Sequence, residues 1–162
     1  ADGTRRKAAL MIKLVFCDMD GTLLDAQGNL PEGLGAILAE LKAHGVLFAP
    51  ASGRQYAALL RHFQPWAEDL LFCAENGAYV VRRGEELFST TIAPYLCREI
   101  VRRAAAVPGG YNVWCGKKCA YVVSRNESFF TEMKKYYTEY EIVKDFADVQ
   151  DPSIKFSVCD PL

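Results

Sequence analysis

The stretch "LVFCDMDGTLLD", residues 14–25, decides the fold. The apolar run from Met11 to Cys17 is rich in β-forming residues and ends abruptly at Asp18 and Asp20. Such a run is typical of a strand buried on both faces of a parallel sheet. Two carboxylates at alternate positions of an extended strand point the same way and raise each other's pKa unless a cation lies nearby. The stretch therefore predicts a strand that ends at a site for a hard divalent cation such as Mg²⁺.

The residues that follow alternate between helix and strand patterns. Two further apolar runs, over 46–52 and 70–74, have the length of buried strands. Apolar residues at helical spacing precede each of them, over 31–44 and 54–64. This βαβαβ order predicts an α/β fold whose core is a Rossmann-like, doubly wound parallel sheet.

The second half of the chain has a different pattern. It predicts a β-hairpin that turns at Arg83 and Gly84, followed by an α+β module. The module is expected to contain helices over 94–107 and 127–140, the second capped by Asn126, and strands over 111–115, 120–124 and 154–159. The predicted division is a leader or tag-like extension over 1–10, a core over 11–91 and an inserted α+β cap domain over 92–162.

The composition favours a globular protein and argues against some classes of partner. The chain has 162 residues, a formal net charge of −1 and 51% hydrophobic residues, enough for one core or one core with a small module. The balanced charge gives no reason to expect a nucleic acid or a membrane surface as partner. No run approaches the roughly 18 to 20 apolar residues of a membrane span. Residues 1–10 do not resemble a secretory signal, so we expect a cytoplasmic location.

The six cysteines lie mostly within apolar runs. In a cytoplasmic chain they are expected to be reduced core residues. Cys115 and Cys119 flank a possible hairpin turn and could face each other across two strands. A C-x₃-C pair without a His or a second pair is weak support for zinc.

Three polar loops follow the first three predicted strands, over residues 18–22, 52–54 and 75–78. Because ligands bind outside the carboxyl ends of the strands in an open α/β sheet, these loops are expected to meet at one edge. Ser52 and the backbone amides of Gly53 and Arg54 would form an anion site there, at the start of a helix. Beside a carboxylate that binds a metal, such a site suits phosphate chemistry.

Each loop alone also has a structural interpretation. D-x-D-G occurs in turns and in fragments of calcium loops, Ser52 with Gly53 can cap a helix, and Asn76 with Gly77 can form a tight turn. Their occurrence in order after three successive strands favours the functional interpretation.

The segments "DMDGTLL", "ASGR" and "ENGA" together resemble the opening half of a haloacid dehalogenase superfamily phosphatase of the Cof type. The first segment, after an apolar strand, is specific to the superfamily, and the other two indicate the branch with a large α/β cap. The resemblance covers residues 11–91 by motif, and residues 92–162 only by the order of helices and strands. It implies Mg²⁺-dependent hydrolysis of small phosphorylated metabolites such as sugar phosphates.

The resemblance also implies a role for each residue of the site. Asp18 would attack phosphorus and form an aspartyl-phosphate, and Asp20 would protonate the leaving alcohol and then activate water. Mg²⁺ would be held by the Asp18 carboxylate and the Asp20 backbone carbonyl. The groups that bind the phosphate or line its pocket would be Met19, Gly21, Ser52, Gly53, Arg54 and Asn76.

Two features of the family are missing from these 162 residues: a Lys that neutralises the phosphate, and an acidic loop with further metal ligands. Lys155 lies in a predicted strand of the cap and is not assigned the first role. The first strand would also lack an outer neighbour and form an exposed apolar edge. We interpret the sequence as a C-terminally shortened chain, weakly active alone and prone to self-association through that edge.

Two other functions stay open, a phosphosugar mutase of the same superfamily and a catalytically silent phosphate-ligand binder. Nothing in the predicted cap separates the phosphatase from the mutase. The presence of both Asp18 and Asp20 argues against the binder, which has little need of an acid/base carboxylate.

Overall fold

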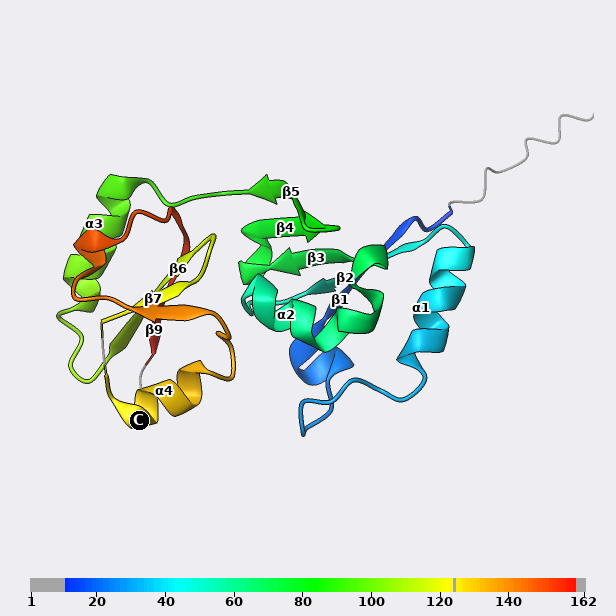
Figure 1. The fold of residues 1–162 in the computed structure, drawn as a ribbon, viewed down its shortest axis with the longest axis horizontal. Coiled ribbons are helices and arrows are strands. Elements are labelled where there is room, and N and C mark those ends of the chain that lie inside the picture. Colours follow the sequence, from blue (N-terminus) through cyan, green and yellow to red (C-terminus); the bar gives the residue numbers. More distant parts are fainter. Residues whose placement is uncertain (1–10, 124, 160–162) are drawn as a thin grey trace, which may run out of the picture.

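The strands form two sheets that lie side by side. The computed structural model describes residues 11–123 and 125–159, so the predicted leader at 1–10 lies outside the described residues. One sheet has five strands in the order β1-β2-β3-β4-β5, and the other has four in the order β8-β7-β6-β9. The chain crosses between them after β5 (Glu85–Ser89) and before α3 (Pro94–Ala104), as Figure 1 shows. The crossing lies near the predicted domain boundary, and the boundary itself stays a prediction.

The five-stranded sheet begins with the predicted βαβαβ unit. Its elements are β1 (Leu14–Asp18), α1 (Leu34–Ala43), β2 (Leu47–Ala51), α2 (Tyr56–Phe63) and β3 (Leu71–Ala74). β1, β2 and β3 are parallel, and the hairpin of β4 (Tyr79–Arg82) and β5 extends the sheet in antiparallel fashion. The hairpin turns at Arg83 and Gly84, both with positive φ, as predicted. The predicted α/β fold is confirmed.

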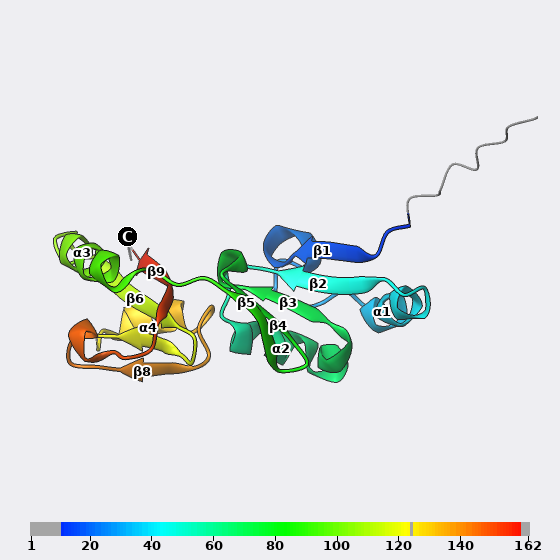
Figure 2. The ribbon, with the colours of Figure 1, turned by 90° about the horizontal axis from the view of Figure 1, so that it is seen from above.

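Both helices of this unit pack against one face of the sheet (Figure 2). Leu38 of α1 and Phe63 of α2 belong to one buried cluster that also contains Phe48 of β2 and Phe72 of β3. The shared face follows from the strand order, because successive right-handed crossovers that move in one direction place their helices on the same side.

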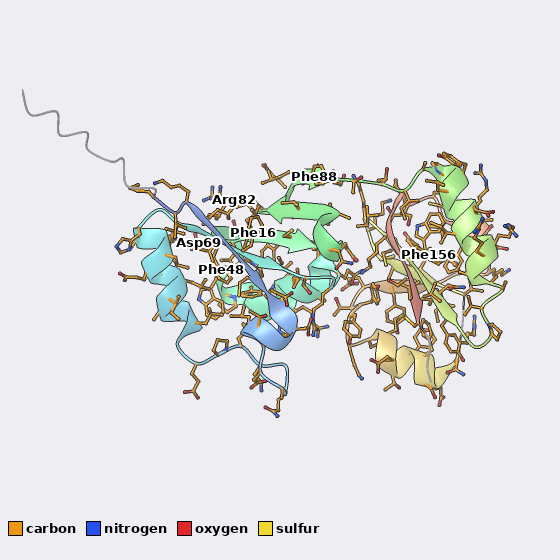
Figure 3. The ribbon with its side chains drawn as sticks, turned by 180° about the vertical axis from the view of Figure 1, so that it is seen from behind. Phe16, Phe48, Asp69, Arg82, Phe88 and Phe156 are labelled. Carbon is orange, nitrogen blue, oxygen red and sulfur yellow. The ribbon has the colours of Figure 1, made fainter. Side chains whose placement is uncertain are left out.

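β1 is an edge strand with alternate side chains exposed. Phe16 of β1 is 57% exposed, whereas Phe48 of the neighbouring β2 is 7% exposed; Figure 3 labels both. The expectation that β1 is buried on both faces is therefore wrong, because the helices cover only one face. Within the described residues β1 pairs with β2 alone, so the expected exposed apolar edge is present.

The four-stranded sheet is covered on both faces. It consists of β6 (Tyr111–Gly116), β7 (Ala120–Val122), β8 (Tyr140–Ile142) and β9 (Ser153–Cys159). On one face, Phe129 of α4 (Glu127–Met133) packs on Val113 and its neighbours. On the other, Trp114 and Phe156 pack with Val101 of α3. No helix within residues 11–123 and 125–159 has both the length and the apolarity to cross a membrane.

The predicted helix over 127–140 starts as expected but ends early. The side chain of Asn126 caps its first turn, and the helix ends at Met133. Gln55, the residue before α2, bonds the chain beyond this point, because its Oε1 accepts from the N–H groups of residues 138 and 139 at 3.0 Å each. A continued helix would have used those groups for its own carbonyls. The chain instead forms β8, which the sequence analysis missed.

The six cysteines are free thiols, and the two nearest in sequence do not face each other. Cys115 packs in the cluster beneath α4, whereas Cys119 packs in the cluster on the opposite face. The expectation that they meet across the hairpin is therefore wrong. Burial raises the pKa of Cys115 to about 12, which disfavours the thiolate that a metal requires.

Candidate active site

The three predicted loops leave the five-stranded sheet at the same edge. Because β1, β2 and β3 are parallel, their carboxyl ends lie together. Asp18 at the end of β1 pairs with Ala51 at the end of β2, and Ala51 pairs with Cys73 near the end of β3. The structure thus brings together segments that are far apart in sequence, as the topology predicts.

Asp18 and Asp20 belong to different elements, although each has an extended backbone. β1 ends at Asp18, and Asp20 lies in the turn that follows, where Gly21 has a φ of 76°. The expectation that both carboxylates lie on one extended strand is therefore wrong. Met19 separates them, with its side chain fully buried in the core while both aspartates are exposed. The positive φ of Gly21 shows why this turn favours glycine.

Arg54 links Asp20 to the four-stranded sheet. Its guanidinium donates to both carboxylate oxygens of Asp20, from Nη2 at 2.5 Å and from Nε at 3.1 Å. Its Nη1 donates to the Lys135 carbonyl at 3.0 Å, and the group lies 5.5 Å from the centre of the Tyr136 ring. The hydrogen bonds and charge of Arg54 hold the pKa of Asp20 below its usual range. The sequence analysis considered only the Arg54 amide and missed this side chain.

The loop of residues 52–54 has a hydrogen bond within it and packs closely against the loop after β3. The Arg54 N–H donates to Ser52 Oγ at 3.1 Å. This amide lies two residues before α2, which begins at Tyr56, so it is not at the start of the helix as expected. An added Cβ on Gly53 would lie 2.7 Å from Asn76 Oδ1, so the approach of Asn76 to this loop requires glycine.

Lys155 of β9 reaches this loop from the other sheet. Its Nζ donates to the Gly53 carbonyl at 2.6 Å and lies 2.5 Å from Glu75 Oε2. Glu75 is only 2% exposed, and burial raises the pKa of its carboxyl group while the charge of Lys155 opposes that rise. Sequence analysis had no signal for this contact, because the bonded residues Gly53 and Lys155 are 102 positions apart.

A pocket of about 250 Å³ lies between the two sheets at this edge. The loops of the five-stranded sheet contribute Asp20 and residues 52–54 to its lining. The opposite side comes from β9, with Lys155, Ser157 and Cys159, and from the segment between α4 and β8, with Tyr136 and Tyr137. Of the predicted site residues, Asp20, Ser52, Gly53 and Arg54 therefore share one pocket. Asp18, Met19 and Gly21 adjoin Asp20 in sequence but do not line the pocket, and Asn76 lies against Gly53 from the loop after β3.

The edge offers a partial set of metal ligands. No group of three or more His, Cys, Asp or Glu within residues 11–123 and 125–159 is arranged to hold a metal ion. Arg54 engages the carboxylate of Asp20, whereas Asp18 takes part in none of the ion pairs among those residues. Mg²⁺ binds through one or two carboxylates and keeps several waters. The exposed Asp18 carboxylate and the backbone carbonyls of the turn fit such a site.

The model of one protein family, the haloacid dehalogenase-like hydrolases, matches residues 15–161. The chain belongs to this family. The chain is 32% identical over 151 residues to the 5-amino-6-(5-phospho-D-ribitylamino)uracil phosphatase YbjI of Escherichia coli, a match that covers 92% of the chain and 56% of the relative. It thus spans about half the length of this curated relative.

Solved structures share the fold of this chain. SMU.1108c from Streptococcus mutans superposes with a TM-score of 0.82 at 24% identity, over 91% of this chain and 57% of that chain. A haloacid dehalogenase-like hydrolase from B. subtilis gives a TM-score of 0.74 at 16% identity, over 87% and 58%. The coverage includes most of both sheets, so their arrangement recurs in other proteins.

Proposed function

We propose that this hydrolase releases inorganic phosphate from small phosphate monoesters, with Asp18 as the nucleophile. The observation that carries the proposal is the pocket between the sheets, whose lining includes Asp20, the hydroxyl group of Ser52 and the cation of Arg54. Cations and hydroxyl donors suit a phosphate group. The YbjI relative, named as a phosphatase, supports the same chemistry.

The proposed reaction has two halves. In the first, the Asp18 carboxylate attacks phosphorus as the bond from phosphorus to the ester oxygen breaks, which leaves the phosphoryl group on Asp18. Asp20 gives its proton to the departing alcohol oxygen. In the second, the Asp20 carboxylate takes a proton from water, whose oxygen attacks phosphorus and releases Asp18 and inorganic phosphate.

The metal would lie at the end of β1. We propose that the Asp18 carboxylate and the Asp20 backbone carbonyl hold Mg²⁺, with waters completing its ligand set. When bound, the ion would supply positive charge that allows two anions, a carboxylate and a phosphate, to approach each other. Ser52 and nearby backbone amides would bind the remaining phosphoryl oxygens.

The four-stranded sheet would act as the cap that selects the substrate. It supplies the pocket wall opposite Asp20, including the rings of Tyr136 and Tyr137. The pocket volume of about 250 Å³ is below the usual range of about 300 to 1,000 Å³ for pockets that bind small molecules, which favours small metabolites. The named substrate of the YbjI relative, 5-amino-6-(5-phospho-D-ribitylamino)uracil, is the first compound to test.

Phosphate release by the full-length protein tests the proposal. We expect it to release inorganic phosphate from an aryl phosphate and from that ribitylaminouracil phosphate when Mg²⁺ is present. Removal of the metal with EDTA should abolish release, and added Mg²⁺ should restore it. Transfer of the phosphoryl group to another position of a sugar phosphate, without free phosphate, would instead indicate a mutase. No turnover of any ester would contradict the proposal.

Replacing Arg54 by Met should change the pH dependence of the reaction. In the first half-reaction Asp20 must carry a proton, so kcat/KM falls as the pH rises through the pKa of Asp20 in the free enzyme. Arg54 lowers that pKa through its hydrogen bonds and charge. The Arg54→Met variant should therefore lose activity at a higher pH than the wild type. A pH profile of kcat/KM measures this, and a shift to lower pH would contradict the role of Asp20 as the acid.

A further inference from the structure

The loop of residues 52–54 has each of its three backbone carbonyls held by a donor from elsewhere in the chain. The first and third accept from the backbone N–H groups of Asn76 and Glu75, at 3.0 Å each. The middle carbonyl, that of Gly53, accepts from Lys155 Nζ at 2.6 Å. Two of the three donors are backbone groups of the neighbouring loop, and the third is a side chain of the four-stranded sheet.

Lys155 is directed at this loop by an irregularity in its strand. β9 pairs with β6 in a register that shifts by one residue between Cys115 and Gly116, which leaves Ile154 without a partner across the ladder. Such bulges re-aim the neighbouring side chain. The Lys155 side chain is 16% exposed, and its Nζ lies 5.1 Å from the centre of the Tyr137 ring. The lysine is thus enclosed by aromatic, carboxylate and carbonyl groups.

The hydrogen bond from Lys155 to the Gly53 carbonyl orients the whole peptide group to which that carbonyl belongs. The Gly53 carbonyl and the Arg54 N–H belong to the same planar peptide group, so orienting one orients the other. That N–H donates to Ser52 Oγ at 3.1 Å. Lys155 is therefore connected to the Ser52 hydroxyl through one rigid peptide plane. Glycine has more conformational freedom than other residues, so this plane depends on an external partner.

We propose that Lys155 is a positioning residue for the phosphatase reaction, which holds the Gly53–Arg54 peptide plane and thereby aims the Ser52 hydroxyl at the phosphoryl group. The inference rests on the proposed function. It assigns Lys155 no contact with the reacting atoms. Glu75 keeps the ammonium group in place, because a buried carboxylate and a buried ammonium each require the other.

Three variants of the full-length protein separate positioning from mere stability. Lys155→Met removes the bond to Gly53 and leaves Glu75 as a buried charge without a partner, which destabilises the fold. Lys155→Met combined with Glu75→Gln removes both charges and avoids that penalty. Lys117→Met breaks another ion pair between the sheets, in which Lys117 Nζ lies 2.9 Å from Glu86 Oε1, and serves as the matched control.

The double variant gives the decisive kinetic result. We expect its melting temperature to lie near that of the wild type and its KM for a phosphate ester to be about tenfold higher, with a smaller change in kcat. The Lys117→Met control should keep the wild-type KM. A double variant with wild-type KM would overturn the inference, because the Ser52 hydroxyl would then be correctly placed without the bond from Lys155 to Gly53.

Hydrogen exchange at the Arg54 amide gives a readout that needs no activity. We expect this amide to exchange at least tenfold faster in the double variant than in the wild type, and at the wild-type rate in Lys117→Met. Unchanged exchange in the double variant would overturn the inference. If the wild type turned over no phosphate ester, the proposed function would fail while this measurement still tested the hold of Lys155 on the loop.

Discussion

Replacing Asp18 by Asn is expected to lower kcat for phosphate release by about 10³-fold or more. The amide of Asn has nearly the same shape as the carboxylate but is not a nucleophile under these conditions. Asp18 is exposed at the end of β1, so the substitution should leave the fold intact. Phosphate release by the purified full-length variant, measured with saturating Mg²⁺ and substrate, checks the expectation.

A second measurement on the same variant identifies the nucleophile directly. Acid quenching of the wild type during turnover should trap a phosphoryl group on the protein, and Asp18→Asn should trap none. Asp69 provides a matched control, because it is an aspartate that pairs with Lys42 on the surface, away from the pocket (Figure 3). Asp69→Asn should keep wild-type turnover. A fully active Asp18→Asn variant would remove Asp18 from the mechanism.

Shortening Phe129 to Ala should lower the free energy of unfolding of the four-stranded sheet by about 3–5 kcal/mol. Phe129 is 2% exposed, and its ring stacks on that of Tyr111 with the ring centres 4.7 Å apart. The truncation leaves a cavity that the surrounding sheet and helix can fill only in part. Denaturant unfolding followed by hydrogen exchange measures the loss strand by strand.

The same experiment tests whether the chain folds as two domains. Phe63→Ala is the matched variant in the other cluster, where Phe63 is fully buried. We expect Phe129→Ala to lower the protection of amides in β6 and β7, and Phe63→Ala to lower it in β2 and β3. Equal loss in both sheets from either substitution would contradict the predicted division at residues 91 and 92.

Local patterns of the sequence predicted the elements that local physics controls. Apolar runs with β-forming residues identified β1, β2 and β3, and the turn at Arg83 and Gly84 identified the hairpin of β4 and β5. The rule that loops meet at the carboxyl edge of a parallel sheet placed Ser52 near Asp20, in one pocket. These predictions used only local patterns and the strand order, and no knowledge of which distant residues contact each other.

The features that sequence analysis missed all depend on pairs of distant residues. Gln55 binds the chain after the helix that ends at Met133 across 83 and 84 positions, and the Arg54 side chain bonds Asp20 across 34. Lys155 reaches the site from a strand whose register shifts beside it. Periodicity and motif spacing contain no information on such pairs, since each partner is locally an ordinary polar residue.

The backbone of residues 75–77, after β3, adopts a conformation that lowers stability and holds side chains beside the candidate site. Glu75, Asn76 and Gly77 have φ values of 52°, 59° and 86°, so three successive residues adopt the left-handed conformation. For each of the two residues other than glycine this costs on the order of 1 kcal/mol. Glycine at position 76 would relieve this cost and remove the side chain beside Gly53, whereas glycine at position 75 would leave the buried ammonium group of Lys155 without its counter-ion and destabilise the fold. A variant with glycine at position 76 that gains stability should therefore be a poorer catalyst.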